Sequence, residues 1–203
     1  MDDVRALIFD VDGVLITGHA EKGGWWHVDM EADLGLHPDL FQRTFFPPFW
    51  EDIVLGRRGI EECLGPVLAD IAPHLDVETL LAYWFEKDAG LDEDLLIKLE
   101  ALRSHTSLCL HLATNQEHRR ANYLWQTMGF EHRFDALHYS ADIGHQKPSP
   151  EFFVEVENRT GLMGPALLFF DDQERNVEAA RARGWQAYVW TGIEVLERVL
   201  VTA

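Results

Sequence analysis

The chain has 203 residues, of which 47% are apolar, enough for one domain of ordinary size or a core with an inserted subdomain. Its 17 basic and 35 acidic residues give a net charge of −18, which argues against nucleic acid or an anionic membrane surface as a partner. No apolar run approaches the roughly 18 residues of a membrane span, and the first residues enter a predicted strand rather than a leader.

The first predicted element is a buried strand from Ala6 to Phe9, and it delivers two acids, Asp10 and Asp12. Side chains two residues apart in a strand share a face. At about 4 Å and an effective dielectric near 20, two such charges repel by roughly 4 kcal/mol. The pair therefore suggests a metal site, or one acid that attacks and one that carries a proton. An Asp-Gly turn is the alternative.

Residues 16–89 differ from the rest of the chain. Helical patterns cover Glu61 to Ile71 and Val77 to Phe85, and no further strand is predicted. We expect a helical cap at 16–89, joined by a flexible stretch at 17–24 and a return linker near 87–92. Residues 1–15 and 90–203 would form the core. Such a cap can close over a crevice and exclude water.

Two groups of cap residues could contact a substrate. Six aromatic residues are expected to form the cap interior, with a substrate wall as the alternative: Trp25, Trp26, Phe45, Phe46, Phe49 and Trp50. Arg57 and Arg58 lie between two glycines in a predicted loop. We expect both to be solvated, and contact of one with the substrate is the alternative.

Helices and strands alternate after the cap. A helix from Asp92 to Leu102 precedes an apolar strand, Leu108 to Ala113, which ends at Thr114 and Asn115. The next helix carries Ala121, Leu124, Trp125 and Met128 and stops at Gly129.

The last third of the chain repeats this order. Lys147 lies at the entry to a helix that Ser149 caps and Pro150 starts. A strand from Leu167 to Phe170 ends in Asp171 and Asp172, and a helix to Arg183 and a strand from Gln186 to Trp190 follow. The pattern predicts an α/β fold, a Rossmann-like parallel sheet with helices on both faces. Because ligands bind beyond the carboxyl ends of such strands, these polar residues should meet in one site.

Four motifs carry a family resemblance: Asp10-Val-Asp12-Gly-Val, Thr114-Asn115, Lys147-Pro-Ser-Pro and Asp171-Asp172. In this order they resemble those of the haloacid dehalogenase (HAD) superfamily, in its phosphatase-type branch. The resemblance covers residues 4–15 and 90–190, whereas the cap matches only in length and helical character. Within the family the chain is similar to the small sugar-phosphate phosphatases and to the phosphatase domain of some epoxide hydrolases.

The resemblance implies a Mg²⁺-dependent phosphomonoester hydrolase that acts on a small phosphorylated metabolite. Asp10 would attack phosphorus to give an aspartyl-phosphate, and Asp12 would be the general acid and base. Mg²⁺ is assigned to the Asp10 carboxylate, the Asp12 carbonyl and Asp172, with Asp171 direct or through water. Thr114 and Lys147 would hold phosphate oxygens. A structural pairing of Lys147 with Asp171 or Asp172 is also expected.

Other polar residues near the motifs have less defined roles. Asn115 is expected to orient the phosphate or the Asp12 loop, or to cap a helix. Arg119 and Arg120 are expected to be solvated, and His145 could touch the substrate. The ten histidines show no ligand spacing beside an acid, so no zinc site is expected. Cys63 and Cys109 are both expected to be buried, reduced thiols, which suits the cytoplasm.

Several other functions share parts of this pattern. A phosphomutase needs the same acids and a cap that admits a second sugar hydroxyl. A 2-haloacid dehalogenase needs neither a metal nor the second aspartate, and a receiver-like signalling domain would not place its nucleophile after the first strand. A catalytically silent phosphate- or metal-binding protein also fits. The identity of the substrate and the oligomeric state do not follow from the sequence.

Overall fold

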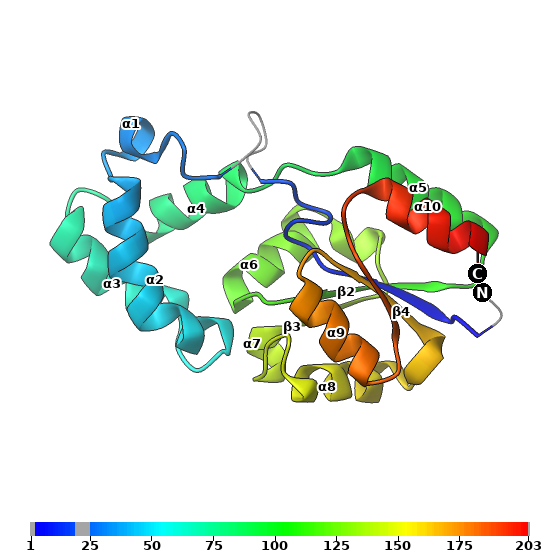
Figure 1. Ribbon diagram of the computed structural model, residues 1–203. Helices are drawn as coiled ribbons and strands as arrows, with labels where there is room; N and C mark the ends of the chain where they lie inside the picture. The colour runs from blue at the N-terminus through cyan, green and yellow to red at the C-terminus, as the bar shows by residue number, and fades with distance from the viewer. Residues whose placement is uncertain (1–2, 19–24, 203) are drawn as a thin grey trace.

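The computed structural model describes residues 3–18 and 25–202. Most of the flexible stretch predicted at 17–24 therefore lies outside the described residues. The described part has two regions, an α/β core and a group of helices beside it (Figure 1).

The core is built on a parallel five-stranded sheet in the order β3-β2-β1-β4-β5. Its strands are β1 (Ala6–Phe9), β2 (Cys109–Thr114), β3 (Ala136–Tyr139), β4 (Leu167–Asp171) and β5 (Gln186–Val189). In the centre, Phe9 of β1 aligns with Leu112 of β2 and with Phe170 of β4. All four residues of β1 are fully buried, as expected for a parallel strand covered on both faces.

The sequence did not predict β3. This strand lies at the edge of the sheet, and three of its four residues are only half-buried. Its short Ala-Leu-His-Tyr sequence offers no apolar run and no clear alternation. The other four strands are confirmed.

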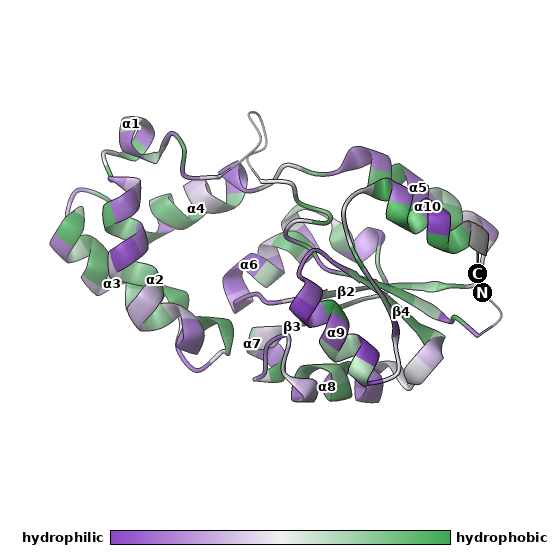
Figure 2. Ribbon diagram, viewed as in Figure 1, coloured by the Kyte–Doolittle hydropathy of each residue, from purple (hydrophilic) through white to green (hydrophobic). Residues whose placement is uncertain are grey.

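Helices cover both faces of the sheet (Figure 1). Leu7 and Phe9 pack with α5 (Glu93–His105) and α10 (Ile193–Thr202) in one hydrophobic cluster. Ala6 and Ile8 pack on the opposite face, in a second cluster with α8 (Pro150–Thr160) and α9 (Glu174–Ala182). The side chains of β1 thus alternate between two cores. Hydrophobic residues are concentrated in the strands and on the inner helix faces in Figure 2.

A helical cap lies beside the core and consists of α1 (Met30–Leu34), α2 (Pro38–Val54), α3 (Ile60–Ile71) and α4 (Val77–Lys87). Its helices pack around a separate hydrophobic cluster, which includes Phe41, Leu64 and Leu80. The helices expected at 61–71 and 77–85 are confirmed. The exact cap limits, 16 and 89, stay predictions. Near them the two connections run side by side, since the Thr17 amide donates to the Gly90 carbonyl at 2.7 Å.

Shorter elements complete the core. These are α6 (His118–Asn122), a π-helical turn (Tyr123–Thr127), α7 (Ser140–Ile143) and two 3₁₀ turns (Phe130–His132 and Gly164–Ala166). Within the described ranges, no helix has the length and apolar character needed to cross a bilayer.

The expectation for the two thiols is correct for one of them. Cys63 is buried in the cap, but Cys109 is exposed, and both are free. Cys109 is the first residue of β2, and the five residues that follow it in the strand are buried.

Candidate active site

The central strands deliver acids to one edge of the sheet. Asp10 follows β1, and its amide donates to the Phe170 carbonyl of β4 at 2.9 Å, which places it beside Asp171. The Asp10 carboxylate is held by its own loop, because the Val11 amide donates to Oδ1 at 2.7 Å. The predicted meeting of the motifs at the carboxyl ends of the strands is therefore confirmed in geometry.

Lys147 lies at the centre of this group and is almost fully buried. Its Nζ donates to Asp10 Oδ1 at 2.9 Å, to Asp171 Oδ2 at 2.6 Å and to the Ala113 carbonyl at 2.7 Å. An ammonium has three N–H groups, and these contacts use all three. Of the two structural partners expected for Lys147, the structure shows Asp171 and not Asp172.

Asn115 positions the loop that carries Lys147. Its Nδ2 donates to the Lys147 carbonyl at 2.9 Å, and its Oδ1 accepts from the Lys147 amide at 2.8 Å. Both of these hydrogen bonds of the Asn115 side chain are with the backbone of Lys147. Asn115 does not cap α6, because Glu117 accepts the first helical amides. Within the described residues the side chain of Asn115 makes no hydrogen bond to Asp12, because the amide that contacts Asp12 comes from Gln116. Asn115 lines a cavity beside the site, and its expected role in orienting the phosphate stays a prediction.

Three carboxylates surround the position expected for a metal. Asp10, Asp171 and Asp172 each offer an oxygen, and these oxygens lie within 4.8 Å of one another. Hard oxygen donors of this kind suit Mg²⁺, so the residues fit the metal that the motifs imply. Asp171 accepts hydrogen bonds from Lys147, Asn176 and the Gln173 amide. Asp172 is half-buried, and the described contact of its side chain is with Gln173 at 2.8 Å.

The charges in this cluster are unbalanced. Burial raises the pKa of Asp10 to about 8, the Lys147 ammonium lowers it, and the Asp171 carboxylate raises it. Burial by itself lowers the pKa of Lys147, but Asp10 and Asp171 outweigh burial and raise it above its usual value. One permanent cation thus faces three acids, and a divalent cation would relieve the excess negative charge.

Asp12 lies at the rim of this cluster. Its Oδ2 accepts a hydrogen bond from Gln116 Nε2. Burial raises the pKa of Asp12, and Arg120 and Gln116 oppose the shift. A raised pKa favours the protonated carboxyl group, the form that a general acid needs. Gln116 was not predicted, because a single glutamine after a strand carries no motif.

Arg120 contradicts the expectation that it is solvated. It is buried, and its guanidinium donates to the Phe85 and Asp88 carbonyls at the end of α4. Arg119 is partly exposed and pairs with Glu61 of α3 and Glu78 of α4. Both arginines therefore join α6 to the cap. The sequence could not show this, because the cap carbonyls and acids come from distant positions.

The remaining predicted site residues are found in different places. Thr114 is the last residue of β2 and is buried at the same edge of the sheet. His145 lies in a separate surface hollow with Pro150 and Glu151, so its expected contact with the substrate is not supported. Arg57 pairs with Asp52 and Arg58 with Glu62 on the exposed surface, as expected for solvated residues.

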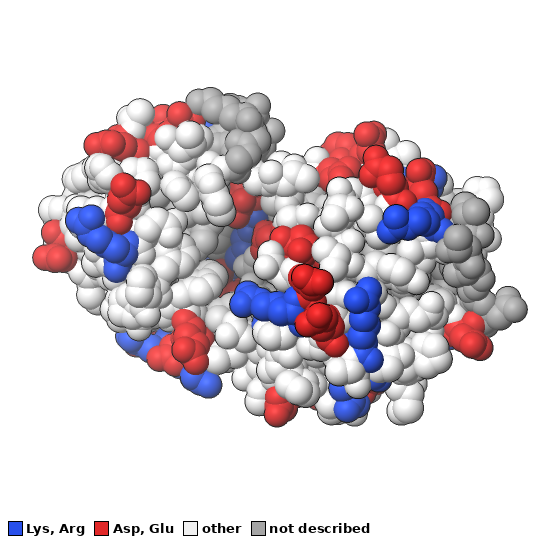
Figure 3. All heavy atoms as spheres, in the orientation of Figure 1, with Lys and Arg blue, Asp and Glu red and all other residues white. Residues whose placement is uncertain are grey.

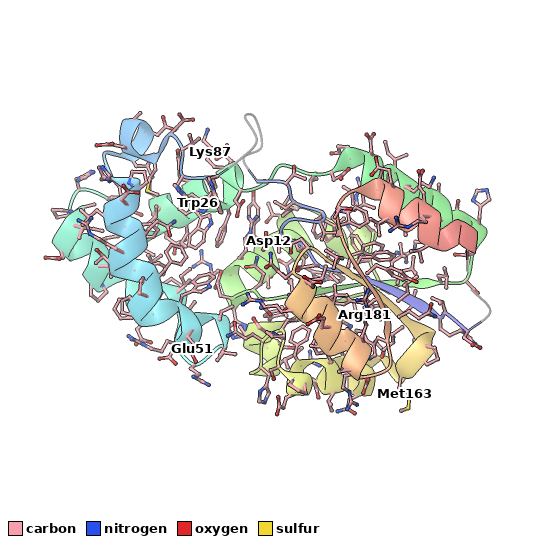
Figure 4. All side chains as sticks on the ribbon, viewed as in Figure 1. Asp12, Trp26, Glu51, Lys87, Met163 and Arg181 are labelled. Carbon is pink, nitrogen blue, oxygen red and sulfur yellow. The ribbon has the colours of Figure 1, made fainter. Side chains whose placement is uncertain are left out.

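A cavity of about 910 Å³ separates the acids from the cap. Figure 3 shows this hollow, with acidic and basic atoms at its base, and Figure 4 shows Asp12 and Trp26 on opposite sides of it. The expectation of a purely internal aromatic group is correct for Phe45, which is fully buried. It also holds for Trp26, which is buried in the cap cluster, and Phe46, Phe49 and Trp50 pack against that cluster. It is wrong for Trp25, which is exposed. Four members of the set also line the cavity: Trp25, Trp26, Phe46 and Trp50. Phe46 and Trp50 lie on α2, and Trp25 and Trp26 lie in the segment that precedes α1.

Comparison with known proteins identifies related chains. The family described as haloacid dehalogenase-like hydrolase matches residues 4–184. The chain is 26% identical over 190 residues to fructose-1-phosphate phosphatase YqaB of Escherichia coli, covering 89% of this chain and 93% of that protein. It is 24% identical over 198 residues to a phosphorylated carbohydrates phosphatase of Thermotoga maritima, with coverages of 89% and 82%.

A solved structure shares the fold. A HAD family enzyme of Bacteroides thetaiotaomicron, in complex with magnesium and inorganic phosphate, superposes with a TM-score of 0.73 at 19% identity. The match covers 92% of this chain and 93% of that one.

Proposed function

Since the chain belongs to the haloacid dehalogenase-like hydrolases and is a hydrolase of the phosphatase type, we propose that it is a Mg²⁺-dependent phosphomonoesterase for a small phosphorylated metabolite. One observation carries this proposal. Asp10, Lys147 and Asp171 form a buried, ion-paired group, and Asp12 and Asp172 lie at its border with the cavity.

Asp10 is the proposed nucleophile. Its Oδ1 accepts from Val11 and Lys147, whereas no hydrogen bond to Oδ2 is found within residues 3–18 and 25–202. Oδ2 is then available to attack phosphorus, which forms an aspartyl-phosphate and breaks the bond to the leaving alcohol. Burial raises the pKa of Asp10 to about 8, so the ionised form that this attack needs depends on the nearby Lys147 ammonium, which lowers the pKa, and a bound divalent cation would favour it further.

Asp12 is the proposed general acid and base. In the first step it protonates the departing alkoxide, and in the second it accepts a proton from the water that attacks the aspartyl-phosphate. Gln116 holds its carboxylate in place for both transfers. A leaving halide needs no proton, so the retained and oriented Asp12 supports a phosphatase over a 2-haloacid dehalogenase.

The remaining residues hold charge and phosphate. When bound, Mg²⁺ would be held by the Asp10 carboxylate, the Asp12 carbonyl and Asp172, with Asp171 direct or through water, and would neutralise phosphate charge. Thr114 would bind phosphate oxygens through its hydroxyl. The N–H groups of Lys147 already have partners, so its proposed contribution to phosphate binding is mainly its charge.

The test of this proposal is hydrolysis of p-nitrophenyl phosphate by the purified protein with Mg²⁺. Asp10→Asn removes the attacking oxygen, and we expect the rate to fall by at least about a thousandfold with an unchanged circular dichroism spectrum. EDTA should abolish the wild-type activity, and added Mg²⁺ should restore it. A fully active Asp10→Asn variant would contradict the proposal. Release of inorganic phosphate, rather than an isomerised ester, separates a phosphatase from a phosphomutase.

A further inference from the structure

The cap side of the cavity determines which leaving group fits beside the phosphate site. Seven of its lining residues lie between residues 25 and 84, and we call them the aromatic wall: Trp25, Trp26, His27, Gln42, Phe46, Trp50 and Trp84. Gln42, Phe46 and Trp50 follow one another at intervals of four residues along α2, so they form one stripe on that helix. The cavity volume of about 910 Å³ leaves room for a leaving group much larger than the phosphate itself.

Four rings of this wall pack against one another, those of Trp26, Phe46, Trp50 and Trp84. The rings of Trp26 and Trp84 stack with centroids 4.7 Å apart and planes 11° apart. Trp50 and Phe46 pack against Trp84 at 5.9 Å and 5.7 Å. A wall whose side chains are already fixed by packing can stack on a ring without an ordering cost at binding.

The aromatic wall carries no charge. It contains no Lys, Arg, Asp or Glu. Burial lowers the pKa of His27, which favours the neutral imidazole, and Asp39 acts in the opposite direction. The cap surface that borders the hollow is correspondingly white in Figure 3. A second anionic group on the substrate would lose its hydration against these rings without gaining a counter-charge, which is costly.

Charged residues also line the cavity outside the wall. Arg120 donates hydrogen bonds to the Phe85 and Asp88 carbonyls, and its guanidinium lies 3.7 Å from the Asp88 carboxylate. Arg175 lies exposed on α9, on the core side of the cavity. Neither arginine belongs to the aromatic wall, and Asp88 adds an acid next to it, so the charge argument concerns the part of the leaving group that lies against the wall.

Two neutral polar groups interrupt the aromatic wall. Gln42 presents an amide, and His27 has a buried Nδ1 that meets no hydrogen-bond partner in the part of the chain that the structure describes. This nitrogen has almost no accessible surface, so a ligand can reach only the accessible part of the imidazole and the Gln42 amide. A hydroxyl of the leaving group is suited to both positions.

We propose that the leaving group of the substrate is an uncharged ring alcohol, whose apolar face stacks on the aromatic wall and whose hydroxyl reaches His27 or Gln42. This inference rests on the phosphatase function proposed above and narrows its substrate class. A sugar ring and an aromatic ring both present the required face. The inference excludes phosphorylated carboxylic acids and bisphosphates as preferred substrates.

The first experiment compares kcat/KM with Mg²⁺ for glucose 6-phosphate, phenyl phosphate, glycerol 1-phosphate and phosphoglycolate. We expect at least one ring ester to exceed both acyclic esters by about tenfold or more, and the better ring identifies the sugar or the aromatic class. Trp50→Ala should lower kcat/KM for that ring ester by roughly five- to tenfold and leave phosphoglycolate nearly unchanged. Phe49→Ala is the matched control, because Phe49 is on the same helix but does not line the cavity.

A second variant tests the charge argument by gain of function. Gln42→Lys places a cation on the aromatic wall, and we expect kcat/KM for phosphoglycolate to rise at least about tenfold relative to the ring ester. Gln126→Lys adds the same charge at an exposed position outside the cavity and should not change this ratio.

The two proposals fail in different ways. If phosphoglycolate is hydrolysed as well as the ring esters by the wild type, or if Trp50→Ala slows all esters equally, the uncharged-ring inference is overturned and the phosphatase function stands. If no ester is hydrolysed with Mg²⁺, the phosphatase function itself fails.

Discussion

The charge balance of the site depends on one lysine, whose ammonium contacts two carboxylates. One buried ammonium, Lys147, lies between the proposed nucleophile Asp10 and the structural acid Asp171. Asp171 also accepts hydrogen bonds from Asn176 and from the Gln173 amide. These bonds fix its carboxylate, which in turn orients the Lys147 ammonium. Asp172 has fewer described partners and borders the cavity, which suits a direct metal ligand.

Gly13 controls where Asp172 can lie. Its φ of +83° favours glycine, and a Cβ at this position would lie 2.7 Å from Asp172 Oδ2. The acid loop and the Asp172 carboxylate are therefore packed too closely for any side chain between them. This contact ties the geometry of the first motif to that of the last one.

Gly13→Ala should displace Asp172 and weaken the proposed metal site. We expect the Mg²⁺ concentration for half-maximal phosphatase activity to rise at least about tenfold, because a shifted ligand no longer fits octahedral geometry. Gly161→Ala is the control, since its φ is +69° but its Cβ would meet nothing within 4 Å. An unchanged Mg²⁺ requirement in Gly13→Ala, or an equal change in both variants, would show that Asp172 does not hold the metal.

At the scale of elements, the cap contacts the core away from its two connections. The C-terminal end of α2 meets α7, where Ser140 Oγ donates to the Val54 carbonyl at 2.6 Å. Gly56 approaches this point so closely that a Cβ would lie 2.3 Å from the Ala141 carbonyl. Arg119 of α6 bridges α3 and α4 through Glu61 and Glu78. These contacts hold the aromatic wall of α2 at a defined distance from the acids.

Ser140→Ala tests this contact. Ser140 is fully buried, and loss of its hydroxyl leaves the Val54 carbonyl without its donor. We expect the free energy of unfolding in urea to fall by about 1–3 kcal/mol. Ser104→Ala removes an exposed hydroxyl from α5 and should change stability by less than about 0.5 kcal/mol. Equal effects of the two variants would mean that the α2–α7 contact contributes nothing specific.

At the scale of the whole molecule, acid stability is linked to a buried histidine pair. His111 of β2 and His138 of β3 lie with Nδ1 and Nε2 3.0 Å apart under the core helices. The pKa of His138 is lowered to about 3, mainly by burial and then by the nearby His111 and Arg159. Burial also lowers the pKa of His111. An unfolded histidine titrates near 6.5. Between pH 6.5 and 3 the unfolded chain therefore binds protons that the folded chain does not, and stability falls as the pH falls.

His138→Gln should reduce this pH dependence. Because the pKa of His138 is lowered on folding, we expect this residue to cost the wild type about 2 kcal/mol of unfolding free energy between pH 7.5 and pH 5. The variant should not show this decrease. Urea unfolding at several pH values measures it. His132→Gln is the control, because it makes the same substitution at an exposed histidine. If the His138→Gln variant keeps the wild-type pH dependence of the unfolding free energy, His138 does not cause that dependence.

Much of the core and of the site follows from local sequence. Continuous apolar runs predicted the four strands other than β3, because strands buried on both faces cannot carry polar residues. Polar residues at the ends of those runs predicted the site, since parallel strands end at one edge. The helices of the cap were predicted from their periodicity, whereas β3, an edge strand, left no such signal.

The sequence by itself determined the α/β alternation and the set of acids, lysine and hydroxyl that meets at one edge of the sheet. Only the tertiary structure decided which side chains pair within that set, that Gln116 orients Asp12, and that Arg120 is buried under α4. It also decided that Trp26, Phe46 and Trp50 border the cavity. The reason is physical: strand and helix signals come from neighbouring residues, whereas pairing and burial arise between segments that are far apart along the chain.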